Sequence, residues 1–120
     1  MAVHNGTVLV VEDDDETRTY LIQVLELEGF KVVGFANGAD ALAYMQKSEE
    51  PCIVVLDMRM PVMDGPALRA ALLRDPRLAV VPVVIVTAYD PSAASGLSAL
   101  RVFRKPLDVD AFVGVVRENC

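Results

Sequence analysis

Five apolar segments, separated by segments with the periodicity of helices, constrain the fold of this chain more than any other feature of its sequence. They cover residues 7–11, 31–35, 52–56, 80–86 and 102–103, and the last is the weakest. Four of them are rich in β-branched residues, and three are apolar almost throughout. Continuous apolar runs of this length are typical of strands that are covered on both faces.

The segments between these runs show the spacing of amphipathic helices. The predicted apolar faces comprise Leu21, Val24 and Leu25, then Ala39, Leu42 and Ala43, and finally Val109, Phe112, Val113 and Val116. Signals for the start of a helix support three of these segments: Asn37-Gly38, Asp64-Gly65-Pro66 and Asp108. Strand and helix thus alternate five times, which predicts an α/β fold: a three-layer, doubly wound, five-stranded parallel sheet.

Length and charge set further limits. With 120 residues, of which 53% are apolar, the chain is expected to form a single domain over residues 1–120. A net charge of −6 disfavours direct binding of nucleic acid. No apolar run is long enough to span a bilayer, and the first residues lack the features of a signal peptide. We therefore expect a soluble, cytoplasmic protein that binds neither nucleic acid nor membrane.

The chain has two cysteines, Cys52 and Cys120. They form no C-x-x-C pair, and no histidine cluster accompanies them. In a cytoplasmic protein this pattern predicts neither a structural disulfide nor a zinc site. Cys52 opens an apolar run and is interpreted as a small core residue.

Acidic residues follow two of the predicted strands. Five acids in a row, residues 12–16, come after the first strand, and Asp57 comes directly after the third. The last two acids of the row suit the start of a helix, whereas Glu12 and Asp13 lie at the strand end itself. Functional groups gather at the carboxyl ends of the strands in such a sheet, so Glu12, Asp13 and Asp57 are expected to lie together.

Three carboxylates in one place need a counter-charge. Two such groups about 5 Å apart repel by roughly 3 kcal/mol at an effective dielectric constant near 20. A hard divalent cation removes this repulsion, and a set of oxygen ligands suits Mg²⁺ better than zinc. The fourth and fifth strands run into Thr87 and Lys105. A carboxylate nucleophile, a cation, a hydroxyl donor and a lysine are the groups that phosphoryl transfer to aspartate requires.

Four motifs of the sequence resemble those of the receiver domain of bacterial two-component response regulators. They are VLVVEDD at residues 8–14, LDMRMPVMDG at 56–65, VTA at 86–88 and KP at 105–106. Together and in this order they are highly specific, and the resemblance extends from residue 8 to about residue 117. It implies a CheY-like (flavodoxin-like) fold with the strand order 2-1-3-4-5.

The resemblance also implies a role for each residue of the site. Asp57 would be the phosphoacceptor, Thr87 the switch hydroxyl, and Lys105 the residue that contacts the phosphoryl group. The implied Mg²⁺ ligands are Glu12, Asp13, Asp57 and the backbone carbonyl of Arg59. The Lys105-Pro106 peptide bond is expected to be cis. The implied donor is a phosphohistidine of a sensor histidine kinase or phosphotransfer domain. The implied product is a switch that controls the binding of an unidentified downstream protein, with homodimerisation open, rather than a metabolic enzyme.

Two departures from the family pattern concern the output face. Receivers usually carry Tyr or Phe three residues before the lysine, where this chain has Val102. Phe103, one step later, points to the other face of a strand. The seventeen residues between Thr87 and Lys105 are fewer than usual, and residues 91–100 have a composition of low helix propensity. We therefore expect a short or irregular fourth helix and an atypical output face.

Alternative functions differ in the residues that they need. An aspartate-nucleophile phosphatase of the haloacid-dehalogenase type needs an aspartate two residues after the nucleophile, where this chain has Arg59. A mononucleotide binder needs a glycine-rich loop in place of the five acids. An EF-hand from Asp13 lacks its glycine and final glutamate, replaced by Arg18 and Val24. A degenerate receiver, acting as a phosphorylation-independent interaction module, stays open. Tyr89 is either an aromatic substitute for the switch or an exposed loop residue.

Overall fold

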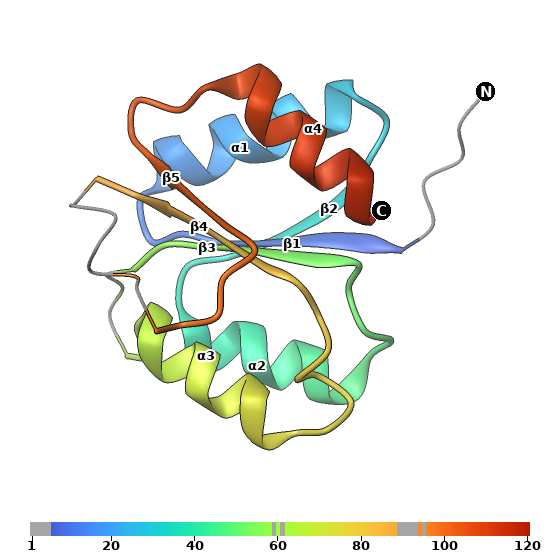
Figure 1. The fold of residues 1–120 in the computed structure, drawn as a ribbon, viewed down its shortest axis with the longest axis vertical. Coiled ribbons are helices and arrows are strands. Elements are labelled where there is room, and N and C mark those ends of the chain that lie inside the picture. The colour runs from blue at the N-terminus through green and yellow to red at the C-terminus, as the bar shows by residue number, and fades with distance from the viewer. Residues whose placement is uncertain (1–5, 59, 61, 89–93, 95) are drawn as a thin grey trace.

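A computed structural model of the protein describes residues 6–58, 60, 62–88, 94 and 96–120. Five parallel strands form one sheet in the order β2-β1-β3-β4-β5, as expected. The strands are β1 (Thr7–Val11), β2 (Lys31–Phe35), β3 (Ile53–Leu56), β4 (Val83–Thr87) and β5 (Arg101–Arg104). The helices are α1 (Asp15–Leu27), α2 (Gly38–Lys47), α3 (Gly65–Arg74) and α4 (Val109–Asn119). Figure 1 shows α1 and α4 on one face of the sheet and α2 and α3 on the other, which confirms the three layers.

The three inner strands carry the continuous apolar runs. β3 and β4 are buried along their whole length, and β1 is buried after its first residue. The edge strands β2 and β5 are partly exposed. This is the pattern expected for a parallel sheet with helices on both faces, in which only the outer strands reach the solvent.

One predicted strand begins later than its apolar run. The run starts at residue 80, but β4 starts at Val83, and Val80 is 80% exposed. Val80 lies in a turn after α3, in which the carbonyl of Asp75 accepts hydrogen bonds from the amides of Leu78 and Ala79. A β-branched residue in a turn and one in a strand look alike in a sequence. The prediction was therefore wrong at this boundary.

Every helix begins at a side-chain cap, and the three predicted caps are confirmed. The capping carboxylates and amide each accept a hydrogen bond from the backbone amide three residues further on, and they belong to Asp14, Asn37, Asp64 and Asp108. The predicted apolar face of α2 was only partly right: Leu42 packs against the core, but the fully buried residues are Gly38, Ala41 and Met45, and Ala43 is exposed. A tertiary contact fixes the rotation of α2: the amide of Gly38 donates to the carbonyl of Met63 over 2.9 Å.

The chain between β4 and β5 contains no α-helix in its described residues, which are 88, 94 and 96–100. As far as the described residues extend, this agrees with the prediction of a short or irregular helix in this part of the chain. Gly96 and Ser98 have positive φ angles of 85° and 55°, a backbone conformation that interrupts right-handed helix. Residues 89–93 and 95, which include Tyr89 and part of the predicted helical segment 91–100, lie outside the described residues.

Arg69 of α3 holds this segment in place. Its side chain is only 5% exposed, and its Nε and Nη2 atoms donate to the carbonyls of Leu97 (2.8 Å) and Ser98 (3.2 Å). Burial lowers the pKa of the guanidinium. The Nη1 atom is buried without a hydrogen-bond partner among the described residues. A buried cation on α3 thus anchors the described residues that lead into β5.

The two adjacent residues Val102 and Phe103 face opposite sides of the sheet, as predicted. Phe103 lies on the side of α1 and α4, where its ring meets that of Phe112 edge-on at a centroid distance of 5.8 Å. Val102 packs with the residues on the side of α2 and α3. The aromatic ring of β5 is thereby fixed beneath α4, and the other face of β5 has an aliphatic side chain.

Cys52 and Cys120 form a disulfide, which contradicts the prediction of two free cysteines. Their Cα atoms are 5.3 Å apart, although 68 positions separate them in the sequence. α4 runs back along the sheet from the edge at which β5 ends, so the residue after its last turn arrives where β3 begins (Figure 1). Eleven helical residues and four strand residues both span about 15 Å. The number of residues between two cysteines does not reveal this match of lengths, so the disulfide could not be predicted from it.

Candidate functional site

Backbone hydrogen bonds continue the sheet by one residue beyond several strands and so fix the predicted site residues. The amide of Glu12 donates to Phe35 (2.9 Å), that of Asp57 to Val11 (3.0 Å) and that of Lys105 to Thr87 (2.8 Å). Each donor or acceptor lies at the carboxyl end of its strand. The sheet therefore brings Glu12, Asp57, Thr87 and Lys105 to one edge, as the sequence predicted.

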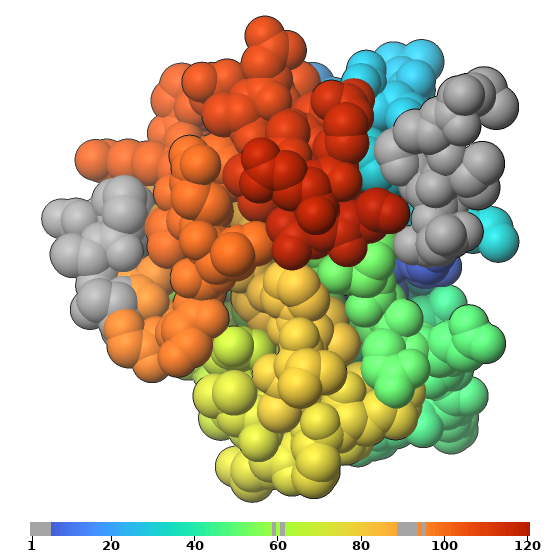
Figure 2. Space-filling model, turned by 45° about the vertical axis from the view of Figure 1, so that its right-hand side comes forward, coloured from blue at the N-terminus to red at the C-terminus, as the bar shows by residue number. Residues whose placement is uncertain are grey.

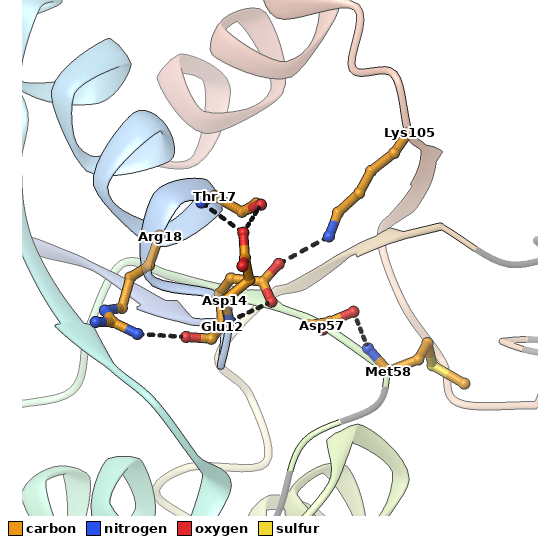
Figure 3. Close-up of polar contacts among 7 residues, drawn as sticks. All are labelled: Glu12, Asp14, Thr17, Arg18, Asp57, Met58 and Lys105. Carbon is orange, nitrogen blue, oxygen red and sulfur yellow. Dashed lines mark hydrogen bonds and ion pairs between the residues drawn. The ribbon is translucent and has the colours of Figure 1, made fainter.

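The three predicted carboxylates lie together. Glu12, Asp13 and Asp57 each offer an oxygen atom, and these atoms all lie within 4.8 Å of one another. Glu12 is 2% exposed and Asp57 is 9% exposed, whereas Asp13 reaches the solvent. One oxygen of Asp57 accepts a hydrogen bond from the amide of Met58 (2.8 Å; Figure 3). Two of the three carboxylates are thus held inside the protein, and the third is open to solvent.

Lys105 supplies one positive charge to this cluster. Its Nζ atom donates to Glu12 Oε1 over 2.9 Å, and Figure 3 shows its side chain reaching across from the end of β5. Burial raises the pKa of Glu12 to about 7, and the Lys105 hydrogen bond, which acts in the opposite direction, does not offset it. Burial acts to lower the pKa of Lys105, but its contacts with Glu12 and the charge of Asp57 leave it raised. Lys105 thus stays charged, and it is one positive group beside three carboxyl groups.

The structure describes Thr87 but not Arg59, the two remaining residues of the predicted site. Thr87 lies at the end of β4 and is 1% exposed, so its hydroxyl belongs to the interior of this edge. Arg59, whose carbonyl the resemblance implied as a metal ligand, lies outside the described residues. The Lys105-Pro106 peptide bond is cis, as expected.

Sequence reasoning missed two residues that shape the site. Arg18 of α1 donates from Nη1 to the backbone carbonyl of Glu12 (2.9 Å; Figure 3) and so ties the first strand end to the helix. Gly65 starts α3 against the loop: a Cβ atom there would lie 2.5 Å from the carbonyl oxygen of Asp57. The sequence marks Gly65 only as part of the helix-start signal Asp64-Gly65-Pro66, and no sequence signal points to the contact made by Arg18.

The cluster fits a magnesium ion by the chemistry of its donors. All three side chains offer carboxylate oxygens, which a hard cation prefers. The three oxygens lie within 4.8 Å of one another, so side-chain movement can bring all of them to one octahedral Mg²⁺, whose ligands lie about 2.1 Å from the ion. Residues Glu12, Asp13 and Asp57 could hold the ion together with water.

A groove opens beside the cluster, between the start of α1 and the chain that follows β5. Its walls include Thr17 and Tyr20 on one side and Lys105, Pro106 and Leu107 on the other. Tyr20 is 48% exposed, an unusual degree for a large aromatic side chain. The edge that carries the carboxylates therefore also has a partly apolar hollow on the side of α1.

The chain matches the family model of the response regulator receiver domain over residues 8–117. It therefore belongs to this family, the receiver domains of two-component phosphorelay systems. For members of the family, Mg²⁺ binding and phosphorylation of an aspartate are standard, and they are typically signalling domains rather than enzymes. The CheY-like fold predicted from the resemblance is confirmed.

Individual relatives agree with this assignment. The chain is 34% identical to sporulation initiation phosphotransferase F of Bacillus subtilis, over 95% of this chain and 93% of the relative. It is 37% identical to the C4-dicarboxylate transport transcriptional regulatory protein of Rhizobium meliloti, but it spans only 24% of that protein. Among solved structures, the signal receiver domain of a signal transduction histidine kinase from Syntrophus aciditrophicus superimposes with a TM-score of 0.86 and 28% identity, over 94% of this chain and 88% of that one.

Among the described residues, the helices are all too short or too polar to cross a lipid bilayer.

Proposed function

We propose that this chain is a working phosphoryl switch, in which Asp57 accepts a phosphoryl group from a phosphohistidine in a Mg²⁺-dependent reaction. The proposal rests on one observation: the side chains of Asp57, Glu12, Asp13 and Lys105 lie together at the carboxyl ends of the strands. Nothing in the packing requires this concentration of charge. Phosphoryl transfer to a carboxylate requires a nucleophile, a cation site and positive charge for the phosphoryl oxygens, and these are the groups that meet here.

In the proposed reaction, an oxygen of Asp57 forms the new bond to phosphorus as the bond from phosphorus to the histidine nitrogen breaks. The imidazole keeps the electron pair of the broken bond and takes up a proton. Bound Mg²⁺ would supply the positive charge that offsets the carboxylates and the phosphoryl oxygens. Lys105 would exchange its contact with Glu12 for one with the phosphoryl group, and the Thr87 hydroxyl would donate to another phosphoryl oxygen.

The donor protein has to cover the edge at which Asp57 lies, because the phosphorus must approach in line with the bond that breaks. The groove beside Lys105 is on this edge, and its aromatic and aliphatic residues, the exposed Tyr20 and Pro106 and the half-buried Leu107, suit an amphipathic helix. A helix of a sensor histidine kinase or phosphotransfer domain is therefore the proposed occupant during transfer.

The output of the switch is proposed to be atypical. Position 102 has a valine, and the ring of the neighbouring Phe103, which is 6% exposed, is held against Phe112. Neither residue therefore supplies an aromatic ring that could move toward Thr87 on phosphorylation. The backbone and Arg69 make hydrogen bonds along this part of the chain: Lys105 to Thr87 at the phosphorylation edge, Leu100 to Val83 at the opposite end of β4 and β5, and Arg69 to Leu97 and Ser98. The proposed readout is a shift of residues 96–104, which an unidentified protein would recognise.

The direct test is intact-mass spectrometry after incubation with acetyl phosphate, with Mg²⁺ or with EDTA. The expected result is the gain of one phosphoryl group with Mg²⁺ and none with EDTA. The adduct should be lost on treatment with hydroxylamine, as an acyl phosphate is. No gain with acetyl phosphate and none with a phosphorylated histidine donor would contradict the proposal and would leave the interaction module as the function.

Binding of Mg²⁺ is expected to raise the stability of the folded chain, because it relieves repulsion among the three carboxylates. At about tenfold excess over Kd the gain is roughly 1.4 kcal/mol, or a rise of about 6 °C in Tm. Asp13→Ala is expected to abolish this rise in a thermal melt with and without Mg²⁺. Asp13 is exposed, so the change should leave the fold intact.

Glu16→Ala is the matched control, since it removes the same charge from an exposed neighbour that is not part of the cluster. This variant should keep the rise in Tm. An unchanged rise in the Asp13→Ala variant would show that the three carboxylates are not the metal site.

A further inference from the structure

The disulfide between Cys52 and Cys120 lies far from the phosphorylation site. Cys52 comes just before β3 and Asp57 just after it, so the length of the strand, about 15 Å, separates them. Both cysteines are partly buried rather than enclosed. Figure 2 shows the C-terminal end of α4, in red, at the molecular surface against the green segment that leads into β3. A reagent or protein can thus approach the bond from solvent.

The surroundings of the two sulfur atoms suit free thiols as well as a disulfide. Both side chains pack against the core cluster on the side of α1 and α4, where a free cysteine behaves as a small apolar residue. The carbonyl oxygen of Thr7 lies 3.5 Å from Cys52 Sγ, a position in which it can accept a hydrogen bond from the reduced thiol. Opening the bond therefore leaves no large polar group without a partner and requires no rearrangement of the sheet.

The disulfide holds the end of α4, and the other contacts of this helix lie closer to its middle. Phe112 and Val116 are fully buried, and Arg117 forms an ion pair of 2.6 Å with Glu28 of α1. Beyond Arg117, the described contacts are local to the helix: Asn119 donates to Val115, and the amide of Cys120 to Val116. Without the covalent bond, the residues after Arg117 would be held by these local bonds, of the kind that fray at helix ends, and by the packing of the partly buried Cys120 side chain.

We infer that Cys52 and Cys120 form a reversible redox site, which locks the last turn of α4 to the sheet when oxidised and releases it when reduced. The exchange partner is a dithiol reductant. Its thiolate attacks one sulfur of the pair and forms a mixed disulfide, and its second thiolate then resolves this bond. Two electrons and two protons pass to the cysteine pair, and the partner leaves as a disulfide. The same exchange in the opposite direction, with the disulfide form of such a partner as the oxidant, forms the Cys52–Cys120 bond again.

The first test compares the oxidised and the reduced parent chain, without any substitution. Intact mass after thiol alkylation should show a disulfide in the absence of reductant and two alkylated thiols after native treatment with dithiothreitol. Reduction should lower Tm by about 10 °C, since a disulfide that closes a long loop commonly contributes that much to a domain of this size. Hydrogen exchange at the amides of residues 116–120 should become at least about tenfold faster.

The double variant Cys52→Ser/Cys120→Ser is the control. It should resemble the reduced parent chain in Tm and in exchange, and reductant should change neither. Phosphoryl uptake at the opposite edge, measured in the same samples, should be equal in the oxidised and reduced forms. The redox site and the phosphoryl switch are thereby tested separately.

Three results would overturn the inference. The cysteines could remain as thiols in oxidised glutathione, which would show that the bond does not form. Dithiothreitol could open the bond only in denaturant, which would make it a permanent cross-link. The two redox forms could also agree in Tm and in exchange, in which case the bond locks nothing.

Discussion

Asp57→Asn is expected to abolish phosphoryl uptake completely. The amide cannot act as the nucleophile, yet its oxygen can still accept the hydrogen bond from Met58 that positions the side chain. The change also removes one of three neighbouring negative charges, so Tm measured in EDTA should be equal to or above that of the parent chain. Intact mass after incubation with acetyl phosphate and Mg²⁺ gives the first result, and a thermal melt gives the second.

Asp64→Asn is a matched control for this experiment. Asp64 caps α3 and is exposed, and asparagine is as good a capping residue as aspartate. The variant should take up one phosphoryl group as the parent chain does. A phosphoryl group on the Asp57→Asn variant would mean that another carboxylate, such as Asp13, is the acceptor.

Phe112→Ala is expected to cause the largest loss of stability among single substitutions in α4. The Phe112 side chain is fully buried and contacts Phe103 of β5, so its removal leaves a cavity between helix and sheet. Such substitutions cost about 3–5 kcal/mol, a large part of the 5–15 kcal/mol that stabilises a typical domain. Unfolding in urea, with the cysteines in the same redox state in both proteins, measures the difference.

Two further variants test whether the cavity is the cause. Phe112→Leu keeps most of the buried volume and should cost about 1.5 kcal/mol or less. Leu27→Ala removes an apolar side chain that is 86% exposed and should change stability by less than about 0.5 kcal/mol. If Phe112→Ala cost no more than Leu27→Ala, Phe112 would not fill the space between α4 and the sheet.

The fold could be predicted from the sequence where burial is continuous. The runs that became β1, β3 and β4 are apolar because both faces of each strand are covered, and short β-branched runs of this kind are rare outside such strands. Prediction failed where a tertiary contact decides. The rotation of α2 depends on the approach of Gly38 to Met63, and the alanines at positions 39, 41 and 43 fit several faces equally well.

The site could be predicted because a parallel sheet converts strand ends into neighbours. Glu12, Asp57, Thr87 and Lys105 are far apart in the sequence, but each lies at or directly after the end of a strand. Which carboxylate the lysine would contact could not be predicted, since this depends on side-chain reach across the edge. The contact of Arg18 with the carbonyl of Glu12 was missed for a related reason: its partner is a backbone atom, which leaves no mark on the sequence.

The disulfide also changes how the chain would respond to mechanical force. Tension applied between the first residues and Cys120 of the oxidised chain can extend only the part before Cys52, because the covalent bond bypasses the residues between the two cysteines, whose sequence separation is 68. β3, α3, β4, β5 and α4 lie within this closed loop and are shielded from tension, while β1, α1, β2 and α2 are not. An unfolding motor that pulls on the chain at Cys120 would have to draw two polypeptide segments, linked by the disulfide, through its pore at once. For such a machine, the oxidation state of two atoms decides how much of the protein can be unravelled.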